Sequence, residues 1–84
     1  MKVTFKLYAT LSDYLPADAR RTNALAMDVA GSTTVAQLIE AQNLPRALVH
    51  LVLVNGFFIQ PGARASHRLK EGDVLAIWPP IAGG

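Results

Sequence analysis

The sequence contains no cysteine among its 84 residues. This absence excludes a disulfide framework, a thiolate nucleophile and a cysteine metal site, and it is compatible with a reducing compartment such as the cytoplasm. The two histidines, His50 and His67, stand alone, with no other metal-binding side chains at ligand spacing. We therefore expect no metal site.

Charge is also scarce, since charged residues make up 17% of the chain and the net charge is +2. Proteins that bind nucleic-acid backbones normally have a dense basic face, whereas these basic residues are scattered, apart from Arg20-Arg21 and a loose group within 64–70. Nucleic acid is thus not an expected partner. The hydrophobic share of 51% is too high for a disordered segment, so we expect one small domain that folds alone.

Long apolar runs are absent as well. No run approaches the roughly 20 apolar residues that a membrane span requires. The first residues, MKVTFKLYATL, lack the continuous apolar stretch of a secretory signal. We expect a soluble, cytoplasmic protein without a membrane partner.

Alternation of apolar and polar residues predicts strands near both ends of the chain. Residues 2–8 alternate in this way, and so do residues 25–29, which suggests an antiparallel hairpin with a long connecting loop. Near the other end, residues 74–78 (VLAIW) are apolar throughout, which predicts a central strand with both faces buried.

The middle of the chain predicts one helix and a second hairpin. Thr34 followed by Gln37 forms a capping-box pattern, and the apolar stripe of the next residues should lie on the sheet until the helix ends before Pro45. Asn55-Gly56 then separates an apolar run at 51–54 from Phe57-Phe58-Ile59, and this dipeptide is the strongest short hairpin signal. The predicted order is β-β-α-β-(β)-β, with the helix packed across one sheet.

The last six residues form an unusual tail, Pro79-Pro80-Ile81-Ala82-Gly83-Gly84. The prolines end the preceding strand and favour an extended chain that does not pair, whereas the glycines fit channels too narrow for side chains. Extended, the tail reaches roughly 20 Å, enough to enter a partner's active site. The alternative is an ordinary frayed terminus.

Four segments together resemble the small sulfur carriers of the ThiS and MoaD type, which are relatives of ubiquitin. They are KLYATLSDYLP, STTVAQLIEA, LVLVNG and LKEGDVLAIWPPIAGG, and the resemblance extends over nearly the whole chain. The resemblance implies an α+β, ubiquitin-like β-grasp fold, with a mixed sheet of four to five strands and one main helix packed across it. The β-grasp domain would span residues 1–78 and the tail residues 79–84.

The resemblance also implies a mechanism centred on Gly84. An E1-like adenylyltransferase of the MoeB or ThiF type would use ATP and Mg²⁺ to adenylate the Gly84 carboxylate, and a sulfur donor would convert the adenylate into a thiocarboxylate. The Pro-Pro tail is most similar to that of the small subunit of molybdopterin synthase, which inserts into a larger, MoaE-like subunit. The chain would then be a carrier without cofactor or metal, and not itself an enzyme. Residues 79–83, Pro79, Pro80, Ile81, Ala82 and Gly83, would enter the partner's active site.

Four aromatic residues are candidates for a partner-docking surface, although packing in the core or at a sheet edge explains most such residues. Core burial should account for most of Phe57, Phe58 and Ile59, with one aromatic left exposed for a partner. Tyr8 and Trp78 are further candidates beside the tail. The Phe-Phe pair departs from the family pattern, in which a polar residue usually follows the Asn-Gly turn.

Several functions fit the same tail. Besides a role in molybdenum cofactor synthesis, the chain could carry sulfur for thiamine or another pathway. It could also modify proteins by joining Gly84 to a lysine, or act as a plain interaction domain whose tail is incidental.

Overall fold

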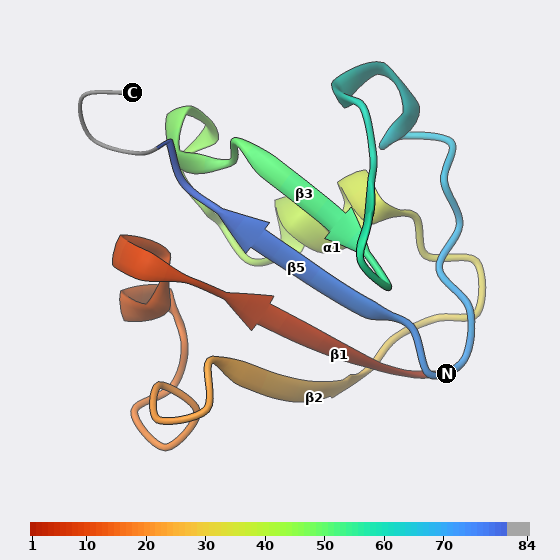
Figure 1. Ribbon diagram of the computed structural model, residues 1–84. Helices are drawn as coiled ribbons and strands as arrows, with labels where there is room; N and C mark the ends of the chain where they lie inside the picture. Colours follow the sequence, from red (N-terminus) through yellow and green to blue (C-terminus); the bar gives the residue numbers. More distant parts are fainter. Residues whose placement is uncertain (81–84) are drawn as a thin grey trace.

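The computed structural model describes residues 1–80, and Ile81–Gly84 lie outside the described residues. Five strands form one mixed sheet in the order β2-β1-β5-β3-β4 (Figure 1). This arrangement confirms the predicted α+β class and the order of elements. The strands are β1 (Lys2–Leu7), β2 (Ala24–Asp28), β3 (Leu51–Val54), β4 (Phe57–Phe58) and β5 (Val74–Trp78).

The centre of the sheet is β5, as its uniformly apolar sequence predicts. It runs parallel to β1 and antiparallel to β3. Leu75 and Ile77 of β5 are fully buried, and so is Phe5 of β1, which pairs with Leu75. Full burial of each such side chain stabilises the fold by about 1.5–3 kcal/mol, so the strand that leads to the tail is anchored in the core.

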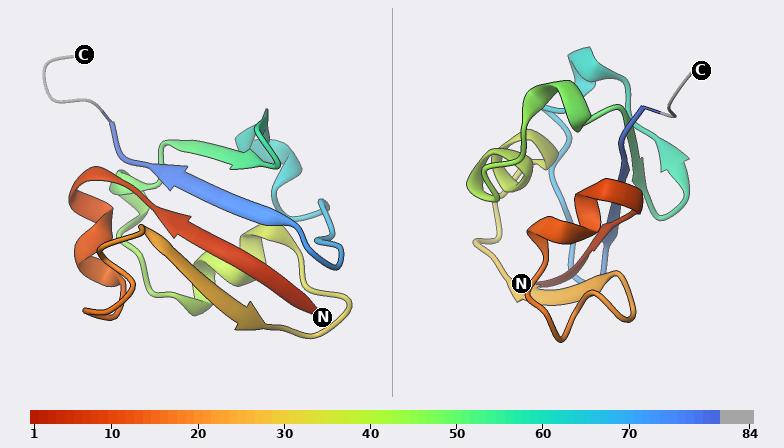
Figure 2. Two further views of the ribbon diagram at one scale, coloured as in Figure 1. Left: turned by 60° about the horizontal axis from the view of Figure 1, so that its bottom comes forward. Right: turned by 90° about the vertical axis from the view of Figure 1, so that its left-hand side faces the viewer.

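Helix α1 (Val35–Ala41) covers one face of the sheet, as the edge-on view in Figure 2 shows. Its start matches the predicted capping box. The Gln37 N–H donates to Thr34 Oγ1 at 3.2 Å, and the Thr34 N–H donates to Gln37 Oε1 at 2.9 Å. Val35 and Leu38 are buried against the sheet, whereas Ile39 is half-buried.

The long segment between β1 and β2 is more ordered than the predicted loop. It contains a 3-10 helix, η1 (Ala9–Tyr14), and both Leu11 and Leu15 are buried in the core. These two leucines are why the segment folds back onto the sheet, where their burial offsets the entropy lost by ordering the chain. Two further 3-10 helices, η2 (Arg46–Leu48) and η3 (Pro61–Ala63), flank β3 and β4.

Within the described residues, none of the helices has the length and hydrophobicity needed to cross a membrane.

Candidate functional site

The root of the tail is fixed by backbone hydrogen bonds on both sides of β5. The Tyr8 N–H donates to the carbonyl of Ile77 at 3.1 Å, and the His50 N–H donates to the carbonyl of Trp78 at 3.2 Å. The next residue, Pro79, is buried, while Pro80 is exposed. Among the described residues, the chain therefore reaches solvent between the two prolines.

Tyr8 and Trp78 meet at this root. Their rings are stacked with centroids 4.1 Å apart and an interplanar angle of 3°. Both side chains are half-buried, so each keeps some surface in contact with solvent. Stacked aromatic pairs contribute about 0.5–1.5 kcal/mol beyond their burial. The stacked pair thus forms a well-packed aromatic surface beside the point where the tail begins.

The two phenylalanines of β4 are both exposed, Phe57 by 75% and Phe58 by 52%. The expectation that core burial accounts for most of the run 57–59 is therefore wrong, because only Ile59 is buried. The physical reason is position, since β4 is a two-residue strand at the edge of the sheet and, among the described strands, has no neighbour beyond it. Paired residues on adjacent strands point to the same face. Phe58 pairs with Leu53 and so faces away from α1.

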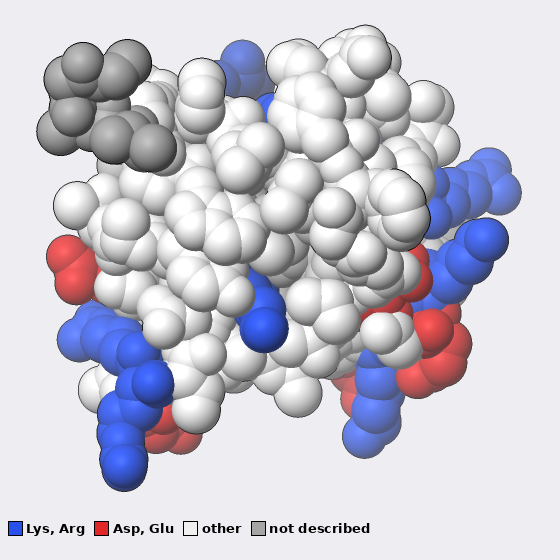
Figure 3. All heavy atoms as spheres, viewed as in Figure 1, with Lys and Arg blue, Asp and Glu red and all other residues white. Residues whose placement is uncertain are grey.

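Within residues 1–80, no other element covers the sheet face opposite α1, and this face is mostly apolar. We call this side the open face. It consists of residues of β1, β5, β3 and β4 that lie opposite one another on neighbouring strands and on the side away from α1. Among these residues Lys6 is the one charged residue, and Figure 3 shows charged side chains gathered mainly at the rim of this side. The open face consists of Thr4, Lys6, Tyr8, Leu51, Leu53, Phe58, Val74, Ala76 and Trp78.

Three of the four predicted docking residues thus share the open face, namely Tyr8, Phe58 and Trp78. Phe57 pairs with Val54, a buried residue, and so lies on the other side of β4. The sequence did not single out Leu51 and Leu53 for this surface. Leu51 is exposed and Leu53 is half-buried. Their place on this face follows from the register of β3 against β5, which a run of four apolar residues does not reveal.

Side-chain hydrogen bonds join the Asn55-Gly56 turn, between β3 and β4, to the turn that precedes β5. Asn55 Nδ2 donates to Asp73 Oδ1 at 2.9 Å, and the Val74 N–H donates to Asn55 Oδ1 at 2.9 Å. The Lys70 N–H donates to Asp73 Oδ2 at 2.8 Å. Asn55 has φ 51° and Gly56 has φ 84°, as the predicted hairpin turn requires. This network holds the turn between β3 and β4 against the start of β5, the strand that leads to the tail.

Groups for metal binding or acid-base chemistry do not gather in this region. Within residues 1–80, there is no cluster of three or more histidine, aspartate and glutamate side chains that can hold a metal ion. His50 is exposed and His67 half-buried. The predicted reacting group, the Gly84 carboxylate, lies outside the described residues, as do Ile81, Ala82 and Gly83. The described part of the chain therefore offers an apolar sheet face and a fixed tail root.

A mixed sheet that grasps one helix, with an open apolar face beside a C-terminal strand, defines the class of ubiquitin-like β-grasp proteins. The sequence matches the Mut7-C ubiquitin family model over residues 1–82, and the chain belongs to this family. No curated protein matches the sequence.

Solved structures give the same fold. The structure of SAMP1 from Haloferax volcanii is 25% identical, with a TM-score of 0.67, and the match covers 100% of both chains. A second structure of this small archaeal modifier protein is 24% identical, with a TM-score of 0.62 over 95% of this chain and 98% of that one. The thiamine biosynthesis protein ThiS from Geobacter metallireducens is 21% identical, with a TM-score of 0.67 over 100% of both chains. These findings support the resemblance to ubiquitin-like sulfur carriers of the ThiS and MoaD type.

Proposed function

We propose that this protein is a sulfur carrier whose reacting group is the main-chain carboxylate of Gly84. A carboxylate is a poor electrophile, so it must first be activated. In the proposed reaction a carboxylate oxygen attacks the α-phosphorus of ATP and pyrophosphate leaves, which gives an acyl adenylate. Hydrosulfide or an equivalent sulfur donor then attacks the acyl carbon and AMP leaves, so that the chain ends in a thiocarboxylate.

The observation that supports this function best is the placement of the tail root beside the open face. The carbonyls of Ile77 and Trp78 are held by Tyr8 and His50, so the position at which the tail leaves the domain is fixed. From Pro79 onward, six residues would span at most roughly 20 Å if fully extended. An enzyme that docks on the open face would therefore receive Gly84 at a defined depth, and glycine leaves the acyl carbon accessible.

The open face fits a protein partner in its composition. Apolar side chains with aromatic anchors, here Phe58 and the stacked Tyr8–Trp78 pair, supply much of the binding energy at protein interfaces. We propose that the E1-like adenylyltransferase docks here and supplies ATP and Mg²⁺, while the carrier itself acts as a co-substrate and not as an enzyme.

For the sulfur acceptor, we propose the large subunit of a molybdopterin synthase. The support is the tail sequence, because Pro79-Pro80 ahead of Ile-Ala-Gly-Gly resembles the tail of the small subunit of that enzyme more than the tails of thiamine-pathway carriers. The chain would then be the non-catalytic small subunit in molybdenum cofactor synthesis.

Protein modification is the second candidate, favoured by the match to a small archaeal modifier protein along the full chain. The same adenylate would serve both functions. In modification, a lysine amine of a target protein attacks the acyl carbon of Gly84, and AMP leaves as an isopeptide bond forms.

Intact-mass spectrometry separates these functions. The protein is incubated with an E1-like enzyme from the same organism, ATP, Mg²⁺ and sulfide, and the mass of the carrier is measured. Replacement of one terminal oxygen by sulfur supports the carrier, whereas a conjugate with another protein supports the modifier. The matched control lacks Gly84. It should unfold at the same urea concentration as the full chain but gain no sulfur.

A further inference from the structure

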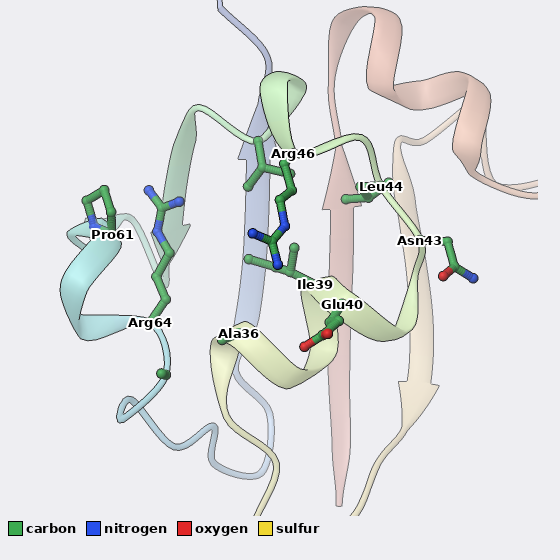
Figure 4. A pocket seen from close by; sticks show the side chains of 10 residues that line it. Ala36, Ile39, Glu40, Asn43, Leu44, Arg46, Pro61 and Arg64 are labelled. Carbon is green, nitrogen blue, oxygen red and sulfur yellow. The ribbon is translucent and has the colours of Figure 1, made fainter.

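A groove on the opposite side of the sheet from the open face is bounded by α1, η2 and η3 (Figure 4). Its cavity volume is about 870 Å³. Most of its lining is aliphatic, so it can hold an apolar side chain. These aliphatic residues are Ala36, Ile39, Leu44, Val49, Pro61 and Ala65.

Arg64 is built into one wall of the groove. Its Nε donates to the carbonyl of Ile59 at 3.1 Å, and its Nη2 donates to the carbonyl of His50 at 3.3 Å. The side chain is half-buried, and the loss of solvent around it lowers the pKa of the Arg64 guanidinium. The two carbonyls fix the plane of the guanidinium and satisfy part of its donors. Its remaining N–H groups suit an anion, because a partly desolvated cation gains more from a charged acceptor than an exposed one does.

Arg46 lines the same groove from η2, and Figure 4 shows that the two arginine side chains reach it from different elements. Neither is neutralised by an acidic side chain, since the one ion pair within residues 1–80 joins the Met1 amino group to Asp28. Glu40 also lines the groove but lies beyond ion-pair distance from both guanidinium groups. Two cations and one anion thus surround an apolar floor.

We propose that this groove binds an acidic segment of a partner protein. A carboxylate of the segment pairs with Arg46 and Arg64, and a neighbouring aliphatic side chain packs on the floor beside Ile39. The lining favours a peptide over a phosphate ligand for two reasons. No aromatic side chain is available there to stack on a base, and Glu40 repels multiply charged groups more strongly than a single carboxylate.

The groove lies close to the root of the tail. His50 donates its N–H to Trp78 and accepts from Arg64, so a single residue separates the Arg64 guanidinium from the root of the tail. The groove and the open face lie on opposite sides of the sheet. A carrier bound through its open face can therefore hold an acidic segment at the same time. This inference does not depend on the chemistry at Gly84.

The probe is a fluorescein-labelled hexapeptide of alternating leucine and glutamate, with binding to the full chain followed by fluorescence polarisation. Two peptides of alternating leucine with glutamine or lysine serve as controls. Arg46→Gln should weaken binding of the acidic peptide about two- to fivefold, the range for one exposed ion pair. Glu40→Gln should strengthen it by a similar factor, and Arg21→Gln, which removes an exposed charge from a segment outside the groove lining, should change little.

Amide chemical shifts give an independent readout. The acidic peptide should shift the resonances of α1, η2 and η3, and added salt should weaken its binding. Any of several results would overturn the proposal. These are shifts confined to the open face, binding that Arg46→Gln leaves unchanged, equal binding of the glutamine peptide, or displacement by inorganic phosphate at equal concentration. Displacement of the acidic peptide by a second copy of the protein, or by the protein's own tail, would assign the groove to a different occupant. Either result would also overturn the proposal.

Discussion

The side chain of Asn55 stabilises both the hairpin turn between β3 and β4 and the start of β5. It donates to Asp73, accepts from the Val74 N–H, and holds a positive φ of 51°. Two replacements separate these roles. Asn55→Gly removes both hydrogen bonds but tolerates the backbone angle, whereas Asn55→Ala removes the bonds and also strains the turn.

The expected magnitudes follow from these contacts. Asp73 is 9% exposed, so losing its partner leaves a largely buried carboxylate oxygen without that donor, and the Val74 N–H loses its acceptor. A hydrogen bond to a charged group contributes about 1.5–3 kcal/mol. We therefore expect Asn55→Gly to lower the free energy of unfolding by about 2–3 kcal/mol. Asn55→Ala should cost roughly 1 kcal/mol more, because alanine in the left-handed region is strained.

The free energy of unfolding of both variants can be measured in urea with the fluorescence of Trp78 as the signal, since Trp78 ends the strand that Asn55 helps to place. In a domain of this size, 1 kcal/mol shifts Tm by about 4–8 °C, so thermal unfolding gives a second measure. The reasoning is refuted if Asn55→Gly unfolds within about 0.5 kcal/mol of the parent chain, the usual range for surface changes. Equal stability of the glycine and alanine variants would refute the role assigned to the positive φ.

Two further predictions concern the helix and the open face. Thr34→Ala removes the side-chain half of the capping box and should cost about 1 kcal/mol in urea unfolding, whereas Thr34→Ser keeps the acceptor and should cost less; equal losses would contradict the cap. Phe58→Lys should raise the KM for adenylation by an E1-like enzyme about tenfold or more, with little change in stability because Phe58 is 52% exposed. Phe57→Lys is the matched control on the other side of β4, and an equal effect from it would argue against the open face as the docking surface.

Much of the fold could be predicted because short local sequence patterns determine it. The alternation at 2–8 and 25–29, the apolar run at 74–78 and the capping box at Thr34 each act over a few residues, and each appears in the structure at or within a residue of the predicted position. The connecting segment after β1 was predicted less well. Leu11 and Leu15 lie among polar residues and next to Pro16, which favour a loop, and only the nearby sheet gives them a place to be buried.

The candidate site was predictable only in part. Tyr8 and Trp78 stand seventy positions apart in numbering, and nothing local shows that their rings stack. The exposure of both phenylalanines depends on β4 being an edge strand, which is a property of sheet order. The groove could not be predicted from the sequence: Arg64 was noted only within the loose basic group at 64–70, and Arg46 belongs to a separate segment that joins it in the groove lining only in the folded chain.

The sequence by itself determined which segments form strands, where the helix begins, and that the chain has a Pro-Pro tail ending in two glycines. Those features rest on backbone preferences and on the period of apolar residues, which act between near neighbours. The tertiary structure alone decided that β5 lies between β1 and β3, that Tyr8 and His50 hold the root of the tail, and that an apolar face stays open beside it. These are pairings between distant segments, selected by the burial of a shared core, and no short stretch of sequence contains them.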